Sequence, residues 1–193
     1  MTYKVIKNFT DKNTTNLLYK HCILMDQRLQ YLEGSHKGKY DQNIYGTYDD
    51  SQVPGAFSKY SESIFDSLLV EKKDLVEKIV GHKIFPSYSY TRVYKKSTEL
   101  KRHLDRKSCE ITISLCLGYE GPSWPLNLET KTGTESIILE PGDALWYRGD
   151  EMQHWRDPFK GDLQAQVFLH YVTQEQDEYD GRATLGLPNK YKR

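Results

Sequence analysis

The segment Glu110-Ile111-Thr112-Ile113-Ser114-Leu115-Cys116-Leu117 alternates apolar and polar side chains at every position. Because successive side chains of a strand point to opposite faces, this pattern predicts a β-strand with one apolar face. The other face is polar but uncharged after Glu110 and carries Thr112 and Ser114. Such a face could line a small cavity inside a barrel or face solvent on an ordinary sheet.

Several similar segments flank this one. Each is short, rich in β-branched or aromatic residues and bounded by Gly, Pro, Asp or Ser, and no helical pattern intervenes after Pro86. Antiparallel sandwiches and barrels have this texture. We therefore predict strands at residues 88–94, 100–105, 110–117, 126–129, 136–139, 144–147, 154–156 and 164–172.

Two helices precede the strands. Apolar residues recur every three or four positions over 13–32, behind a Thr or Asn cap, and over 58–80, where Gly81 would end the helix. We expect both helices to cover the outer apolar face of one sheet. Residues 34–54 between them are polar and aperiodic, which predicts a long loop of the kind that often acts as a mobile lid beside a cleft.

Length and composition limit the possible classes of protein. The 193 residues fit one domain, divided into a helical region with its loop at 1–82, a β core at 83–182 and a tail at 183–193. Basic and acidic residues balance at 27 each, so a nucleic-acid partner is not expected. Three widely spaced cysteines, no signal-like N-terminus and no apolar run of membrane length favour a soluble protein of the reducing cytoplasm.

Three residues form a pattern typical of a metal site. In His103-Leu104-Asp105 the two polar side chains would share one face of a strand, and His154 would approach from a neighbouring strand after the break at 141–143. Two imidazoles and one carboxylate can occupy one face of an octahedron and leave the opposite face open. This is the ligand set of non-haem ferrous oxygenases.

The order of motifs resembles a known family. Five short segments are similar to motifs of the iron- and 2-oxoglutarate-dependent dioxygenases, and the prolyl-hydroxylase-like branch is the most similar. They are Tyr-Thr-Arg-Val-Tyr at 90–94, His-Leu-Asp-Arg at 103–106, Trp-Pro-Leu at 124–126, Pro-Gly-Asp at 141–143 and His-Trp-Arg at 154–156. The resemblance covers about residues 84–182.

What the resemblance implies is a mainly β chain with flanking helices, folded as a double-stranded β-helix, also called a jelly roll. His103, Asp105 and His154 would hold Fe(II), with 2-oxoglutarate and O2 as cosubstrates. The reaction would hydroxylate a C–H bond of an amino-acid residue, a free amino acid or a small metabolite, and release succinate and CO2.

One departure from the family concerns the cosubstrate. The family usually places Arg or Lys nine to eleven residues after the distal histidine, but no Arg or Lys occurs between Lys160 and Arg182. Arg156 is our first choice as a replacement, because on a strand it would share a face with His154. Other candidates are Arg92, Arg106 and Arg148, with Gln164 and Gln166 as neutral donors.

Further residues are assigned relative to this site. Tyr94 lies nine residues before His103, where related hydroxylases often place a tyrosine that donates to the cosubstrate, and Thr112 and Ser114 could complete that pocket. We expect His170 to be a hydrogen-bonded sheet residue, and structural roles for the remaining histidines and the three tryptophans, namely His21, His36, His82, Trp124, Trp146 and Trp155.

Two other functions remain open. A cupin-like metal protein would use the same fold without 2-oxoglutarate, and a non-catalytic binding module would keep the fold and metal but not turnover. The missing basic residue supports the second of these. The sequence does not choose the substrate or the oligomeric state.

Overall fold

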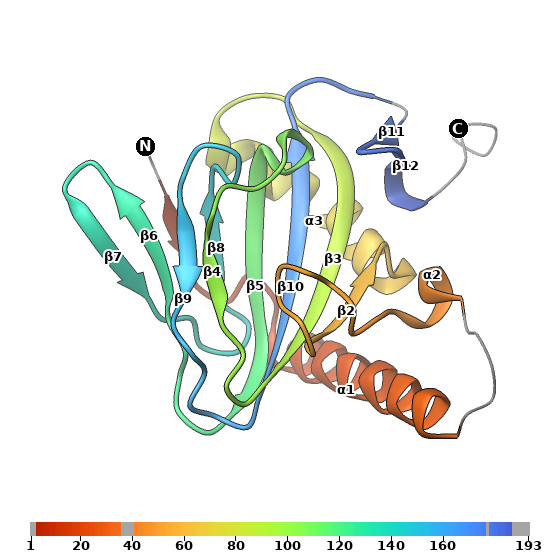
Figure 1. Cartoon of the computed structure of the whole chain (residues 1–193). Coiled ribbons are helices and arrows are strands. Elements are labelled where there is room, and N and C mark those ends of the chain that lie inside the picture. The colour runs from red at the N-terminus through yellow and green to blue at the C-terminus, as the bar shows by residue number, and fades with distance from the viewer. Residues whose placement is uncertain (1–2, 36–40, 177, 187–193) are drawn as a thin grey trace.

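The computed structural model describes residues 3–35, 41–176 and 178–186, and its β core consists of two facing antiparallel sheets. The larger sheet has the order β1-β8-β5-β10-β3-β2, with bounds Lys4–Ile6, Ala144–Tyr147, Ile111–Glu120, Leu163–Val172, Phe85–Lys95 and Phe57–Tyr60. The smaller sheet has the order β4-β9-β6-β7, with bounds Leu100–His103, His154–Arg156, Leu126–Thr130 and Gly133–Ile137. In Figure 1, β4 and β9 overlap β8 of the larger sheet and lie to the left of β5 and β10. This is the predicted double-stranded β-helix.

The helices cover the large sheet, as predicted. Helix α1, Lys12–Gly34, contacts β5 and β3, and helix α3, Ser63–Val80, contacts β3 and β10 (Figure 1). The cap of α1 is Asp11 rather than the expected Thr or Asn, since its carboxylate accepts from the backbone N–H groups of Asn13 and Thr14 at 2.9 and 3.1 Å. Helix α3 ends at Gly81, whose φ of 82° is left-handed, as predicted.

The predicted helix at 58–80 was wrong over its first residues. Residues Phe57–Tyr60 form strand β2, which pairs with β3, and α3 begins only at Ser63. The apolar residues that repeat with a helical period begin at Ile64, so residues 58–60 were included in the helix without a periodic signal of their own. Strands β1 and β2 and the hairpin of β11, Glu178–Tyr179, with β12, Arg182–Ala183, were not predicted. Short 3-10 turns occupy Lys107–Cys109 and Thr184–Gly186.

Two separate cores explain the alternation along β5. The apolar set of this strand packs against the helices in one cluster, exemplified by Ile113 with Leu18 and Leu69, all at most 3% exposed. Burying each such side chain contributes about 1.5–3 kcal/mol. The polar set, Thr112, Ser114 and Cys116, is also completely buried, between the two sheets. This polar face therefore lies inside the barrel rather than facing solvent, although none of the three residues lines the cavity described below.

The segment between α1 and β2 is packed onto the barrel. It contains helix α2, Gln42–Tyr45, and a bridge between Thr47 and Ser58, and it buries Val53 and Ala56 in the core between the sheets. Residues 36–40 of the predicted loop and 187–193 of the predicted tail lie outside the described residues. In the described part of the chain, no helix combines the length and the apolar character needed to cross a membrane.

Candidate metal centre

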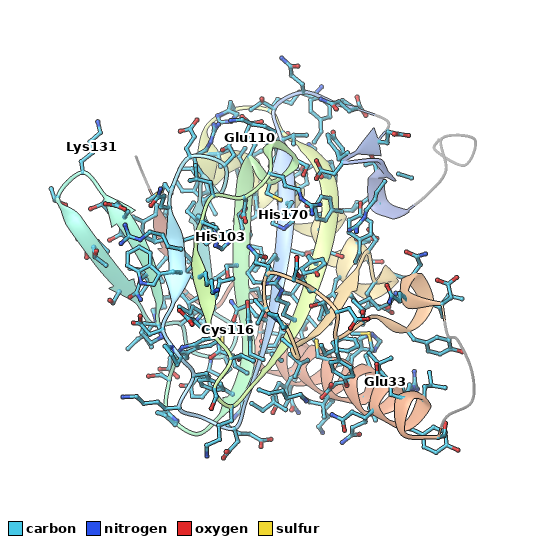
Figure 2. All side chains as sticks on the ribbon, viewed as in Figure 1. Glu33, His103, Glu110, Cys116, Lys131 and His170 are labelled. Carbon is cyan, nitrogen blue, oxygen red and sulfur yellow. The ribbon has the colours of Figure 1, made fainter. Side chains whose placement is uncertain are left out.

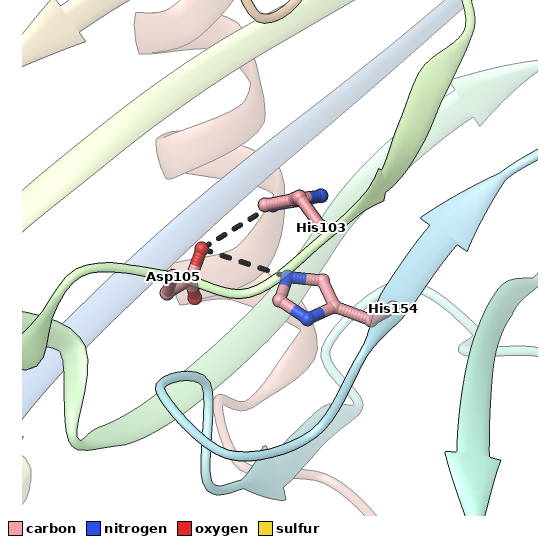
Figure 3. A group of neighbouring side chains, drawn as sticks. All are labelled: His103, Asp105 and His154. Carbon is pink, nitrogen blue, oxygen red and sulfur yellow. Dashed lines mark ion pairs between the residues drawn. The ribbon is translucent and has the colours of Figure 1, made fainter.

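The two histidines of the predicted triad face each other across strands β4 and β9. His103 is the last residue of β4 and is in register with His154, the first residue of β9 (Figure 3). The Nδ1 atoms donate to the carbonyl oxygens of Lys101 and Met152 respectively, each at 2.8 Å. A neutral ring that carries its proton on Nδ1 leaves the Nε2 lone pair available to a metal. Both rings are therefore oriented as ligands.

Asp105 completes the triad from beyond the strand. Strand β4 ends at His103 rather than at the predicted residue 105, and the backbone N–H of Asp105 donates to the carbonyl of Gly149 at 2.9 Å. Its Oδ1 lies 3.3 Å from His103 Nε2 and 3.6 Å from His154 Nε2 (Figure 3). Adjacent ligands at about 2.1 Å from a metal are about 3 Å apart, so these separations fit a facial set. Leu104 points outward, 47% exposed.

The ionisation of Asp105 suits this role. Burial alone would raise the pKa of the carboxyl, but its contacts with His103 and His154 outweigh burial and hold the pKa well below the ordinary range. The group is therefore a carboxylate at neutral pH. Two Nε2 atoms and one carboxylate oxygen lie within 4.8 Å of one another, and this donor set fits a ferrous ion.

A glycine that sequence reasoning missed maintains this geometry. A Cβ on Gly149 would lie 2.4 Å from Asp105 Oδ2, 2.6 Å from Thr112 Oγ1 and 2.9 Å from the carbonyl oxygen of Cys109. The loop after β8 thus approaches Asp105 so closely that only glycine fits. The only signal in the sequence was a glycine two residues after a predicted strand.

A cavity of about 510 Å³ opens beside the triad. This volume lies in the range of small-molecule sites. Its walls come from the triad, from strands β3 and β10, and from the segment before β2. Besides the triad, the lining residues are Gln42, Thr47, Asp49, Asp50, Ser51, Gln52, Tyr88, Tyr90, Arg92, Leu100, Leu104, Arg106, Cys109, Tyr147, Phe168, His170 and Arg182.

His170 is a hydrogen-bonded sheet residue, as predicted, although it also lines the cavity. Its Nδ1 lies 3.2 Å from Thr112 Oγ1, and its ring packs on Tyr88 at 4.9 Å. Burial lowers the pKa of His170 to about 4, so the ring is neutral near pH 7. Figure 2 shows His170 and His103 at a similar level of the barrel, with Cys116 further along β5.

A second polar group lies deeper between the sheets. Arg156 is 2% exposed, and its Nη1 donates to the carbonyl of Trp124. It shares the inner face of β9 with His154, as predicted, and no carboxylate of the described residues pairs with it. Tyr94 and Gln164 are cross-strand neighbours whose Oη and Oε1 atoms are buried without a hydrogen-bond partner in the described chain. None of these residues lines the open cavity.

The other predicted cosubstrate contacts have protein partners. Ser114 Oγ accepts from Gln166 Nε2 at 2.8 Å, and Thr112 Oγ1 donates to the carbonyl of Cys109 at 3.1 Å. Arg148 is paired with Glu110 at 3.2 Å and lies outside the cavity. Arg106 is at the cavity rim, and its side chain is 64% exposed.

The remaining predicted structural residues lie away from the triad. His21 lies 3.3 Å from Glu62, His82 is exposed, and His36 is outside the described residues. Trp124 packs between Tyr94 and Phe159, and the Arg102 guanidinium carbon lies 3.9 Å from the centroid of the Trp155 ring. Both contacts agree with the predicted packing roles. Trp146 packs against the core under the helices.

Comparison with known proteins places the fold. No family model and no curated protein matches the chain. Among solved structures, a prolyl-4-hydroxylase of Pseudomonas putida is 12% identical, with a TM-score of 0.64 over 90% of this chain and 93% of that one. HygX of Streptomyces hygroscopicus, solved with nickel and 2-oxoglutarate bound, is 10% identical, with a TM-score of 0.61 over 94% and 90%.

A viral collagen prolyl hydroxylase from Paramecium Bursaria Chlorella virus-1, solved as a 2-oxoglutarate complex, is 11% identical, with a TM-score of 0.54 over 89% of this chain and 96% of that one. The chain therefore has the double-stranded β-helix fold of the 2-oxoglutarate- and Fe(II)-dependent oxygenases over almost its whole length. This agrees with the fold that the resemblance in sequence implied.

Proposed function

We propose that this chain is an Fe(II)- and 2-oxoglutarate-dependent dioxygenase that hydroxylates a C–H bond of an amino-acid residue, a free amino acid or a small metabolite. The observation that carries the proposal is the triad, whose two Nε2 atoms and carboxylate converge at the edge of a cavity. The shared fold supports it, since two of the similar proteins were solved with 2-oxoglutarate.

His103, Asp105 and His154 would hold the metal where they line the cavity. Iron, O2 and 2-oxoglutarate together supply the oxidising chemistry, with succinate and CO2 as products. The protein fixes the ligands: carbonyl oxygens orient both imidazoles, and Tyr147 packs edge-on against His154 at a centroid distance of 4.9 Å. These contacts to the histidine rings keep the three ligand atoms close together.

Arg156 would bind the far carboxylate of 2-oxoglutarate. A buried guanidinium without an acidic partner is costly, and a bidentate carboxylate is its natural complement. The unpartnered Tyr94 Oη and Gln164 Oε1 lie in the same buried region, with Tyr94 packed on Trp124 at 5.0 Å and Arg156 over the same ring at 4.9 Å. The tyrosine hydroxyl would donate to the same carboxylate.

A non-catalytic binding module, or a cupin-like metal protein, is the second candidate. It is favoured by the observation that Tyr94, Arg156 and Gln164 do not line the open cavity. Under this alternative the triad binds metal, but 2-oxoglutarate is neither bound nor consumed.

Succinate formation separates these functions. The purified protein, supplied with ferrous iron, 2-oxoglutarate and air, should release succinate, and Asp105→Ala should not. Arg156→Gln should raise the KM for 2-oxoglutarate, whereas Arg148→Gln, an ion-paired arginine outside the cavity, should leave it unchanged. Metal binding to wild type without succinate release would support the alternative.

A further inference from the structure

A second buried arginine faces the cavity beside the triad. Arg92 comes from the inner face of β3, is 4% exposed and lines the cavity with His103 and Asp105. It is distinct from Arg156, which lies outside the lining residues. Because Arg156 would bind the 2-oxoglutarate carboxylate, Arg92 is free for another ligand.

The segment before β2 holds Arg92 in place. Its Nη2 donates to Asp50 Oδ2 at 2.5 Å and to Gln52 Oε1 at 2.6 Å, and Tyr90 Oη donates to the same Asp50 oxygen at 2.5 Å. The backbone N–H of Gln52 donates to Asp50 Oδ1 at 2.8 Å. With Val53 buried in the core, this segment is an anchored wall of the cavity.

The arginine keeps unused hydrogen-bonding capacity. Its Nε is buried and has no acceptor among the described residues, although a guanidinium offers five donors. Because this charged donor group borders the cavity and is not fully paired, the cavity favours a ligand that supplies an acceptor. A carboxylate matches the planar guanidinium best.

Acidic side chains lie next to this donor. Asp50 is ion-paired to Arg92, and Asp49, which also lines the cavity, is exposed and has no ion-pair partner in the described chain. Opposite charges therefore stand side by side on the wall that faces the triad. A molecule carrying both an ammonium and a carboxylate complements this arrangement, whereas an internal residue of a peptide carries neither charge on its backbone.

We propose that the substrate is a free α-amino acid, whose carboxylate binds Arg92 and whose ammonium group binds the carboxylates of Asp49 and Asp50. This assignment rests on the proposed function, because it takes the cavity beside the triad as the substrate site. Because Arg92 and the triad line the same cavity, an amino acid bound in this way would lie beside the metal ligands.

Ligand binding can be measured independently of turnover. Saturation-transfer NMR would screen the twenty L-amino acids, each with its N-acetyl amide as a peptide-like control. The protein is measured alone and with Zn(II) and 2-oxoglutarate, because Zn(II) has no redox chemistry. At least one free amino acid should bind, its N-acetyl amide should not, and Arg92→Gln should weaken binding on the order of 10- to 100-fold.

Two further variants control for folding. Arg92→Gln leaves Asp50 without its cation, so the double variant Asp50→Asn with Arg92→Gln removes both charges while keeping planar polar groups. It should fold, as judged by its thermal transition, and still fail to bind. Arg148→Gln, in an ion-pair network outside this cavity, should bind like wild type.

Three results would overturn the assignment: no free amino acid binds under either condition, the N-acetyl amides bind equally well, or the double variant binds like wild type. Failure of the proposed function looks different. In that case the amino acid still binds in an Arg92-dependent manner, but wild type forms no succinate from 2-oxoglutarate.

Discussion

Substituting Gly149 by alanine tests how strongly metal binding depends on the position of Asp105. The added Cβ would lie 2.4 Å from Asp105 Oδ2, whereas a carbon–oxygen contact is normally about 3.3–3.6 Å. The carboxylate or the loop must therefore move by about 1 Å. The methyl group cannot avoid this by shifting away, since Thr112 Oγ1 and the carbonyl of Cys109 lie at 2.6 and 2.9 Å.

A displacement of this size exceeds what a metal site tolerates. Ligands need to be held within about 0.5 Å of their productive geometry, and disturbing the groups that position them typically costs about 10- to 100-fold in metal affinity. We expect Gly149→Ala to weaken metal binding by that factor. Isothermal titration with Mn(II), a hard divalent ion adjacent to iron in the stability series, measures the effect without oxidation.

Gly118→Ala is a matched control. Gly118 lies on β5, the same strand as Thr112, and its added Cβ would meet the Tyr19 ring of α1 at 2.7 Å, on the helix side of the sheet. Overpacking should lower the stability of either variant by about 1–3 kcal/mol. Only Gly149→Ala should lose metal affinity. Equal Mn(II) affinity in Gly149→Ala and wild type would refute the claim that the loop positions Asp105.

Three further predictions concern stability. Burial raises the pKa of Asp66, so the folded wild type loses stability as pH rises through that pKa. Asp66→Asn keeps an Oδ1 acceptor for the N–H and Oγ of Ser89 but does not titrate, so the melting temperature of the variant, relative to that of wild type, should rise between pH 4 and pH 7. A difference in melting temperature that stays constant over this range would contradict the prediction. Asp11→Ala removes the cap of α1 and should cost about 1 kcal/mol in urea unfolding, whereas Asp41→Ala, at the one-turn helix α2, should cost less. Mn(II) at 100 times its Kd should stabilise wild type by about 2.7 kcal/mol and His103→Ala hardly at all, an effect that EDTA should reverse; equal stabilisation of both proteins would place the ion elsewhere.

Much of the β core could be predicted because its sequence alternates with a period of two. Strands β8 and β9 have the predicted bounds, and the alternation along β5 separated the helix-facing side chains from those between the sheets. Strand β2 was taken as helix because four residues are too few to show a period, and its burial under the helices is a tertiary property.

The metal triad was predictable from spacing, since His103 and Asp105 are two residues apart and His154 follows a recognisable strand entry. The partners of Arg92 and the close approach of Gly149 were not. Asp50 lies 42 residues before Arg92, and nothing local in the sequence relates them. Gly149 approaches Asp105 through the packing of one loop on another, which depends on the assembled barrel.

The most direct test of the account is an anaerobic titration of the purified protein with ferrous iron and then 2-oxoglutarate, followed in the visible spectrum. Wild type should develop the weak charge-transfer band of an iron-bound 2-oxoglutarate, with His103→Ala giving no band and Arg156→Gln requiring more 2-oxoglutarate. Iron binding by wild type without any band at saturating 2-oxoglutarate would contradict the proposed dioxygenase function.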